Sequence, residues 1–209
     1  MLELVLAGGW LMVPILLGSV LAMAITGERL MALRRERIIP PQLLVQVRTW
    51  VENRQVDSTR LRQLQQSSPL GLLLATGLAN AHLGREAMKQ SMEEVSALVA
   101  QDLSRYLNLL GTIALVEPMF GLVGSVIGIM EVFGQISTHG GVADVSILSG
   151  GISEALITTA SGLVVAILAT IAHRFLAHRV DTFIVLLEQE ALRLANSLPR
   201  EAAAVARTA

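Results

Sequence analysis

Two glutamates in the sequence lie within or beside long uncharged stretches, where an acidic side chain can bind and release a proton. Glu117 is the one charged residue between positions 106 and 130. A charged carboxyl near the middle of a bilayer costs on the order of 2.5–3.5 kcal/mol unless it is protonated, paired or hydrated. Glu117 is therefore either a proton-binding group in a conduction path or a protonated acid that hydrogen-bonds two helices together. Its sequence context leaves both interpretations open.

Glu154 begins a polar stripe in an otherwise aliphatic stretch. Steps of four and three residues place Glu154, Thr158 and Ser161 on one helix face, with Thr159 beside them. Hydroxyls and a carboxyl can hold a file of hydrogen-bonded water, as a proton route requires. In the alternative interpretation, Glu154 lies at the headgroup level near a helix N-terminus and the threonines bond only backbone carbonyls. The residues alone slightly favour this alternative.

Small residues recur at intervals that predict close helix packing. Gly121 and Ser125 are four residues apart, as are Gly124 and Gly128. Such pairs form a flat strip on one helix face, where a second backbone can approach. Gly162 is assigned to the same kind of packing. Ser125 can bond back to a helical carbonyl or offer a relay site to water, and the residues alone favour the back-bond.

Three stretches are long and apolar enough to cross a membrane. Residues 4–27 carry no charge, residues 106–130 carry only Glu117, and a third stretch is uncharged from 155 to 172 and extends backwards past Glu154. At about 1.5 Å per residue, some 20 helical residues cover the roughly 30 Å apolar layer of a bilayer. The sequence predicts transmembrane helices at 1–27, 106–130 and 146–172.

A signal peptide is the competing interpretation of the first stretch, because the tripeptide at 22–24, Ala-Met-Ala, resembles a cleavage site. Glu3 precedes the apolar run, and no Lys or Arg does. Signal peptides carry positive charge at this point. We therefore expect an uncleaved membrane span.

The distribution of Lys and Arg predicts the topology, because cytoplasmic loops of membrane proteins collect positive charge. Residues 131–153 contain neither, whereas basic residues follow the first and third stretches and precede the second. We therefore expect a multi-pass membrane protein, with its N-terminus outside and its C-terminus cytoplasmic. The remaining segments are a cytoplasmic helical loop at 28–105, a short outside loop at 131–145, and a cytoplasmic C-terminal helix and tail at 173–209.

The cytoplasmic segments are expected to be helical, with breaks that cap and proline signals mark. The pair at 40–41, Pro-Pro, should end the extension of the first span. The cluster at 57–59 should cap one helix, and Ser68 should cap a second that begins with Pro69. No Gly or Pro occurs between 86 and 106, which predicts one long helix that enters the second span. Apolar residues at three- and four-residue spacing predict that the third span continues to about Pro199.

Composition excludes several other classes of protein. Hydrophobic side chains make up 53% of the 209 residues and charged ones 16%, while 16 Lys plus Arg nearly balance 17 Asp plus Glu. An all-α integral membrane protein is therefore predicted. The absence of cysteine excludes disulfides and thiolate sites, and the four histidines, His82, His139, His173 and His178, are too scattered to predict a metal site. No cofactor and no enzymatic activity are expected.

Two segments and the three-span layout resemble a known family. The segments read GLVGSVIG at 121–128 and GISEALITTASGL at 151–163, and a Glu-Arg pair at 28–29 follows the first span. They resemble the ExbB/TolQ/MotA proton-channel family, most closely ExbB and then TolQ, over nearly the whole chain. The resemblance implies a motor subunit of the bacterial inner membrane, so that its outside segments, the N-terminus and the 131–145 loop, are periplasmic. The subunit is expected as a homo-pentamer around the single transmembrane helices of an ExbD or TolR partner dimer. Proton flow along that interface would energise TonB or TolA.

The resemblance also assigns residues. Glu154 matches the glutamate of the family's third span, Thr159 matches its pore-lining threonine, and Ser125 takes the place of the threonine in its second span. The chain departs from the family at Glu117, where alanine is common before proline, and at Leu168, where proline is usual. The family's Tyr-Asn pair after the third span is replaced around positions 173–174.

Together these observations predict an ExbB-type proton channel subunit that, with ExbD, uses the proton-motive force to energise TonB-dependent outer-membrane transport. One alternative is a TolQ-type subunit of the Tol-Pal envelope system, and another is a membrane scaffold that conducts nothing. The residues expected along the proton pathway are Glu154, Ser125, Thr159, Thr158 and Glu117.

Overall fold

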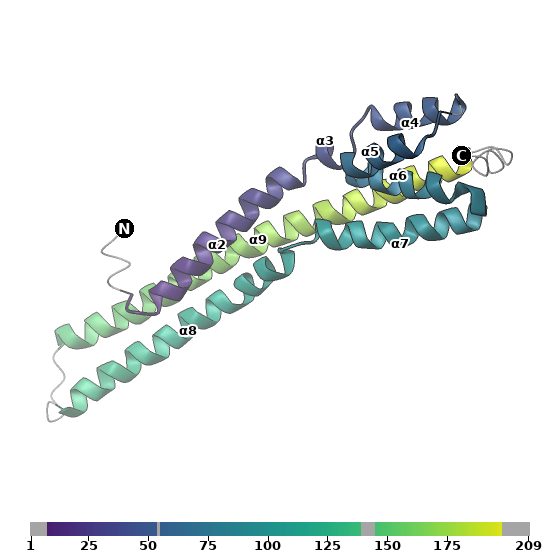
Figure 1. Cartoon of the computed structure of the whole chain (residues 1–209). Coiled ribbons are helices and arrows are strands. Elements are labelled where there is room, and N and C mark those ends of the chain that lie inside the picture. Colours follow the sequence, from purple (N-terminus) through teal and green to yellow (C-terminus); the bar gives the residue numbers. More distant parts are fainter. Residues whose placement is uncertain (1–7, 54, 139–144, 198–209) are drawn as a thin grey trace. The chain divides into compact units, whose positions relative to one another are not determined.

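Three long helices dominate the chain. The computed structural model describes residues 8–53, 55–138 and 145–197, and every regular element within these ranges is a helix (Figure 1). The longest are α2 (Met12–Ala32), α8 (Leu107–Thr138) and α9 (Val145–Ser197). In the described part of the chain, these three helices are long and apolar enough to cross a membrane. The predicted all-α class with three spanning helices is confirmed.

The chain divides into two compact units. The first unit comprises residues 1–28 and 106–176, and the second comprises residues 29–105 and 177–209. Within the described ranges, the first unit contains most of α2, all of α8 and the N-terminal part of α9. The candidate functional residues all belong to this unit, so its internal contacts position them.

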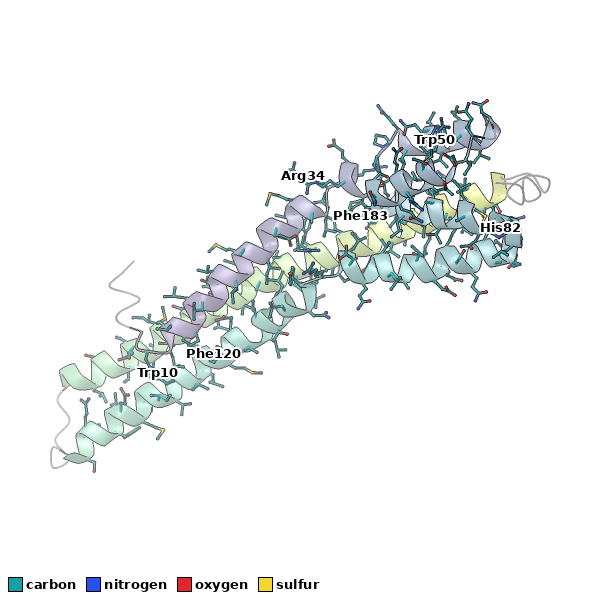
Figure 2. The ribbon with its side chains drawn as sticks, viewed as in Figure 1. Trp10, Arg34, Trp50, His82, Phe120 and Phe183 are labelled. Carbon is teal, nitrogen blue, oxygen red and sulfur yellow. The ribbon has the colours of Figure 1, made fainter. Side chains whose placement is uncertain are left out.

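The second unit contains the shorter helices and the C-terminal part of α9. α6 is its most buried helix, and it packs against α5 and α7. Phe183 of α9, labelled in Figure 2, and Leu187 are also buried residues of this unit. Its short helices are α3 (Arg35–Ile38), α4 (Leu43–Glu52), α5 (Ser58–Ser67), α6 (Pro69–Asn80), the 3-10 helix η1 (Ala81–Leu83) and α7 (Arg85–Leu103).

Two predicted helix caps are present in the second unit. The Asp57 side chain accepts a hydrogen bond from the backbone N–H of Ser58 over 2.6 Å and begins α5. Ser68 Oγ accepts from the N–H of Gly71 over 3.0 Å, and Pro69 occupies the first turn of α6. These side chains satisfy N–H groups that have no partner within the helix.

The prediction of one long helix entering the second span is wrong. α7 ends at Leu103 and α8 begins at Leu107, because Tyr106 takes a left-handed backbone conformation with φ 62°. Arg29 stabilises the end of α7, since its Nη1 lies 3.4 Å and 3.5 Å from the carbonyl oxygens of Asp102 and Leu103. A cation is favourable at a helix C-terminus, where carbonyl groups have lost their helical partners. Neither Gly nor Pro marks this break in the sequence.

The other two predicted extensions have opposite outcomes. The helix of the first span ends at Ala32, and only the four-residue α3 lies between it and the proline pair at 40–41, so the expected extension up to that pair is wrong. The predicted continuation of the third span is confirmed, because α9 runs without a break for 53 residues.

Candidate functional site

The hydroxyls of Ser125 and Thr159 form a pair that joins α8 to α9. Ser125 Oγ lies 2.9 Å from the Ala155 carbonyl oxygen across the helix contact, and only 3.4 Å from the Gly121 carbonyl oxygen in its own helix. The favoured back-bond is therefore the longer of the two contacts. Thr159 Oγ1 contacts Ser125 Oγ directly. It also lies 3.0 Å from the Gly121 carbonyl oxygen and 3.1 Å from that of Ala155.

The hydroxyl pair has more acceptors within reach than it has protons. Each hydroxyl carries one hydrogen and two lone pairs. Ser125 can donate to Thr159 or to the Ala155 carbonyl, while Thr159 can donate to Ser125 or to either of two carbonyls. The hydrogen-bond arrangement can therefore change without moving a helix, as a group that passes or orients protons requires.

Thr158 belongs to a different set of contacts from those of Thr159. Its side chain is buried, with 1% exposed. Thr158 Oγ1 lies 2.7 Å from the Gly8 carbonyl oxygen and 2.9 Å from the Glu154 carbonyl oxygen. The hydroxyl is thus occupied by backbone groups on the side of the N-terminal segment, and the structure does not bring it to the Ser125–Thr159 pair.

Glu154 lines a small hollow at the N-terminal end of α9. The hollow has about 20 Å³ of open space, which is enough for roughly one water molecule. The Glu154 carboxyl approaches Gly9 so closely that a Cβ at that position would overlap Oε1. Trp10 lies at the rim and is exposed (Figure 2). The full lining is Gly8, Gly9, Trp10, Leu11, Gly124, Ile127, Gly128, Glu131, Glu154 and Thr158.

Glu131 is a second carboxylate at this hollow, and the sequence analysis did not single it out. It follows the second apolar stretch directly, in α8. A search for carboxylates next to the ends of the apolar stretches would have found both it and Glu154. Two acids beside a space of this size can attract a cation or a proton.

Glu117 lies apart from the hydroxyl pair, although the sequence analysis grouped them. Its side chain is 2% exposed, and Oε2 has no hydrogen-bond partner among the described residues. The carboxyl faces α2, where a Cβ at Gly18 would overlap Oε1. Two helical turns, about 12 Å along the axis, separate Glu117 from Ser125. Gly18 is the residue that makes room for Glu117, and nothing in its own sequence context marks it.

The four packing glycines lie where α8 and α9 approach each other. A Cβ at Gly162 would meet the Glu117 carbonyl oxygen at 2.6 Å, and one at Gly121 would meet Thr159 Cα at 3.0 Å. A Cβ at Gly128 would meet the Ala155 side chain at 3.2 Å, and one at Gly124 would meet Thr158. The absence of side chains here lets two backbones come close enough for Ser125 and Thr159 to touch.

A titratable side chain that sequence reasoning missed lies at the other end of the same contact. His173 of α9 packs its ring against Gly111 of α8, where a Cβ would meet Nε2 at 3.2 Å. Position 173 is one at which the chain departs from the family pattern.

The sequence of the chain is similar to those of known membrane transport proteins. Residues 65–189 match the MotA/TolQ/ExbB proton channel family. An ExbB-like biopolymer transport protein of Synechocystis is 32% identical over 183 residues, which is 84% of this chain and 70% of that protein. An ExbB homologue of Methanothermobacter thermautotrophicus is 31% identical over 74% of this chain and 54% of its own length. The Tol-Pal system protein TolQ of Haemophilus influenzae is 34% identical over 59% of this chain and 48% of its own length.

The glycine contact predicts that Gly162→Ala destabilises the packing of α8 on α9. The new Cβ meets backbone atoms, which cannot turn aside as a side chain can, so the two helices must separate. Overpacking of this kind typically lowers the free energy of unfolding by about 1–3 kcal/mol. Thermal unfolding of the purified protein in lipid nanodiscs, followed by circular dichroism, measures the change.

Gly150→Ala is the matched control, because Gly150 lies in the same helix and has open space around its Cβ position. We expect this variant to unfold at the wild-type temperature or slightly above it, since alanine favours a helix over glycine. Equal unfolding temperatures for the two variants would contradict the importance of the contact.

Proposed function

The chain belongs to the MotA/TolQ/ExbB proton channel family, and from this we propose that it is an ExbB-type subunit of a proton-driven motor in the bacterial inner membrane. With an ExbD-like partner, the subunit uses the proton-motive force to energise TonB-dependent transport across the outer membrane. The family match places the chain in a proton channel and transport family. The three apolar helices support its location in a membrane.

The observation that carries the proposal is the hydroxyl pair of Ser125 and Thr159 at the glycine contact. Two hydroxyls with interchangeable acceptors, held inside an apolar pair of helices, suit proton passage in addition to joining the two helices. Glu154, beside a hollow of about one water molecule, takes up protons at one end of the path. Water links Glu154 to the pair, because about 7 Å of helix separates it from Thr159.

The proposal includes a partner and an assembly. Among the described residues, the hydroxyls of Ser125 and Thr159 contact each other and backbone carbonyls, and no carboxyl group. The carboxyl that carries the proton past this pair therefore comes from a single-span partner dimer. Copies of this chain form a ring around that dimer, for which a pentamer is expected. TonB then receives the motion of the partner.

The proposed topology follows the positive charges. The N-terminus and the segment between α8 and α9 are periplasmic, while the second unit and the C-terminus are cytoplasmic. Support comes from the segment 131–153, which has no Lys or Arg, and from the arginines at 34, 35 and 37, which follow α2.

A TolQ-type role in the Tol-Pal envelope system is the second candidate. The relatives include TolQ at 34% identity as well as ExbB proteins, so the likeness to TolQ is of the same order. A non-conducting scaffold is the third candidate. It fits the hydroxyl of Thr158, which, among the described residues, hydrogen-bonds only to the backbone carbonyl oxygens of Gly8 and Glu154, as a purely structural side chain would.

For proton conduction, we expect Glu154→Gln to lower proton flux by about tenfold or more, because a positioned proton-transfer group typically contributes at least that much. The measurement is pH-dependent dye response in liposomes that contain this chain and its partner. The double variant Ser125→Ala, Thr159→Val should also lose flux, because it removes both hydroxyls. Both substitutions are small, so we expect the two helices to stay packed.

Glu93→Gln is the control for charge removal, because Glu93 is an exposed glutamate of α7. It should conduct as the wild type does. Wild-type flux in both pathway variants would contradict the assigned pathway, whereas no flux from the wild-type complex would support the scaffold instead.

The topology can be tested by cysteine labelling, since the chain has no cysteine of its own. We expect Gly134→Cys, near the end of α8, to react with a membrane-impermeant maleimide in intact cells whose outer membrane has been made permeable. Glu93→Cys should react only after lysis. The opposite pattern would reverse the assigned orientation.

Deletion of the gene separates the ExbB-type role from the TolQ-type role. We expect loss of iron–siderophore uptake with normal resistance to detergent, because TonB-dependent transport would lose its energy source. Detergent sensitivity with normal uptake would establish the TolQ-type role instead. Co-purification with the partner identifies which single-span protein completes the complex.

A further inference from the structure

Glu117 is a buried titratable group of the first unit that the proposed pathway does not use. Its side chain is 2% exposed, and its Oε2 has no partner among the described residues. A buried carboxylate without hydrogen bonds or a counter-ion is among the costliest groups in a protein. The carboxyl of Glu117 must therefore be either protonated or paired with a cation.

The elements around Glu117 supply no counter-charge. α2 meets the carboxyl through Gly18, and α9 meets the backbone carbonyl of the same residue through Gly162. The sequence of α2 is uncharged from Met12 to Gly27, and that of α9 is uncharged from Ala155 to Ala172. α8 itself has no other charged residue between 106 and 130. No cation of these three helices faces Glu117.

Gly18 makes the contact specific. A side chain at this position would overlap Oε1 of Glu117, so α2 approaches the carboxyl at the one place where its own surface has no side chain. Nothing in the helix packing requires an acid here, since a shorter apolar side chain at position 117 would not reach Gly18 and would leave that contact free. The carboxyl and the glycine form a fitted site that is closed to solvent.

We propose that Glu117 and Gly18 form a second proton-binding site of the subunit, which holds a proton permanently between α2 and α8. The proton neutralises the carboxyl and allows α2 to pack over it. Because the site lies two helical turns from Ser125 and its Oε2 has no hydrogen-bonded neighbour among the described residues, the proton is retained and is not passed to the hydroxyl pair. This site does not depend on proton conduction by the subunit.

Infrared spectroscopy of the full-length protein in lipid nanodiscs tests the site. At about pH 8, exposed glutamates with ordinary pKa values of about 4.3 are ionised. We expect the wild type to keep a carbonyl-stretching band of a protonated carboxylic acid at this pH. Glu117→Gln should lose a component of this band, and Glu93→Gln, which changes an exposed carboxyl of α7, should keep it.

A wild type without such a band would overturn the proposal, and so would an identical band in wild type and Glu117→Gln. The first result would mean that the carboxyl is ionised and that another chain supplies its cation. Gly18→Ala tests the other half of the site, because the new Cβ must displace the carboxyl and change the band frequency. An unchanged band in that variant would remove Gly18 from the site.

Proton flux separates retention from transport. We expect Glu117→Gln to conduct as the wild type does with its partner, since the glutamine mimics the neutral acid in shape and charge. Lost flux together with the lost band would overturn retention, because the proton would then be exchanged during conduction. The flux of Glu154→Gln tests the proposed pathway only. The infrared band tests the protonation of Glu117, so it does not depend on that result.

Discussion

The close approach of two helix backbones, at Gly121 and Gly162, is the contact on which the candidate site depends. Hydroxyl side chains are short, so Ser125 and Thr159 can touch only if α8 and α9 lie almost in backbone contact. Lipid offers no hydrophobic force that would drive two apolar helices together, and close packing of small residues supplies the attraction instead. The glycines therefore do more than permit packing, because they set the distance at which the two hydroxyls can exchange hydrogen bonds.

Two glutamates in the same unit illustrate how surroundings assign different roles to one side chain. Glu154 borders an open hollow with room for about one water molecule, so water can reach its carboxyl. Glu117 is sealed against a glycine of α2 with one oxygen unsatisfied among the described residues. The acid at the hollow suits transfer, whereas the sealed acid suits retention. Sequence position alone placed the two in one group.

Much of the fold could be predicted from the sequence, because membrane spans leave strong signals. Uncharged stretches gave the three spanning helices, and Asp57 and Ser68 marked helix starts in advance. The break at Tyr106 could not be predicted, because a non-glycine residue in the left-handed region has no sequence signature and Arg29, which stabilises the end of α7, is distant in the chain. For the site, periodicity placed Ser125 and the glycines on one face. It could not give the partners of Glu117 and Thr158, since these come from α2 and the segment before it.

The hydroxyl pair has a consequence for the direction of proton flow in the proposed function. Its acceptors lie on both helices at similar distances, so the hydroxyls can donate toward either helix. As a proposed relay, this geometry has no built-in rectification. Vectorial flow must then be imposed from outside the pair, by the electrochemical gradient and by whatever asymmetric element moves against it.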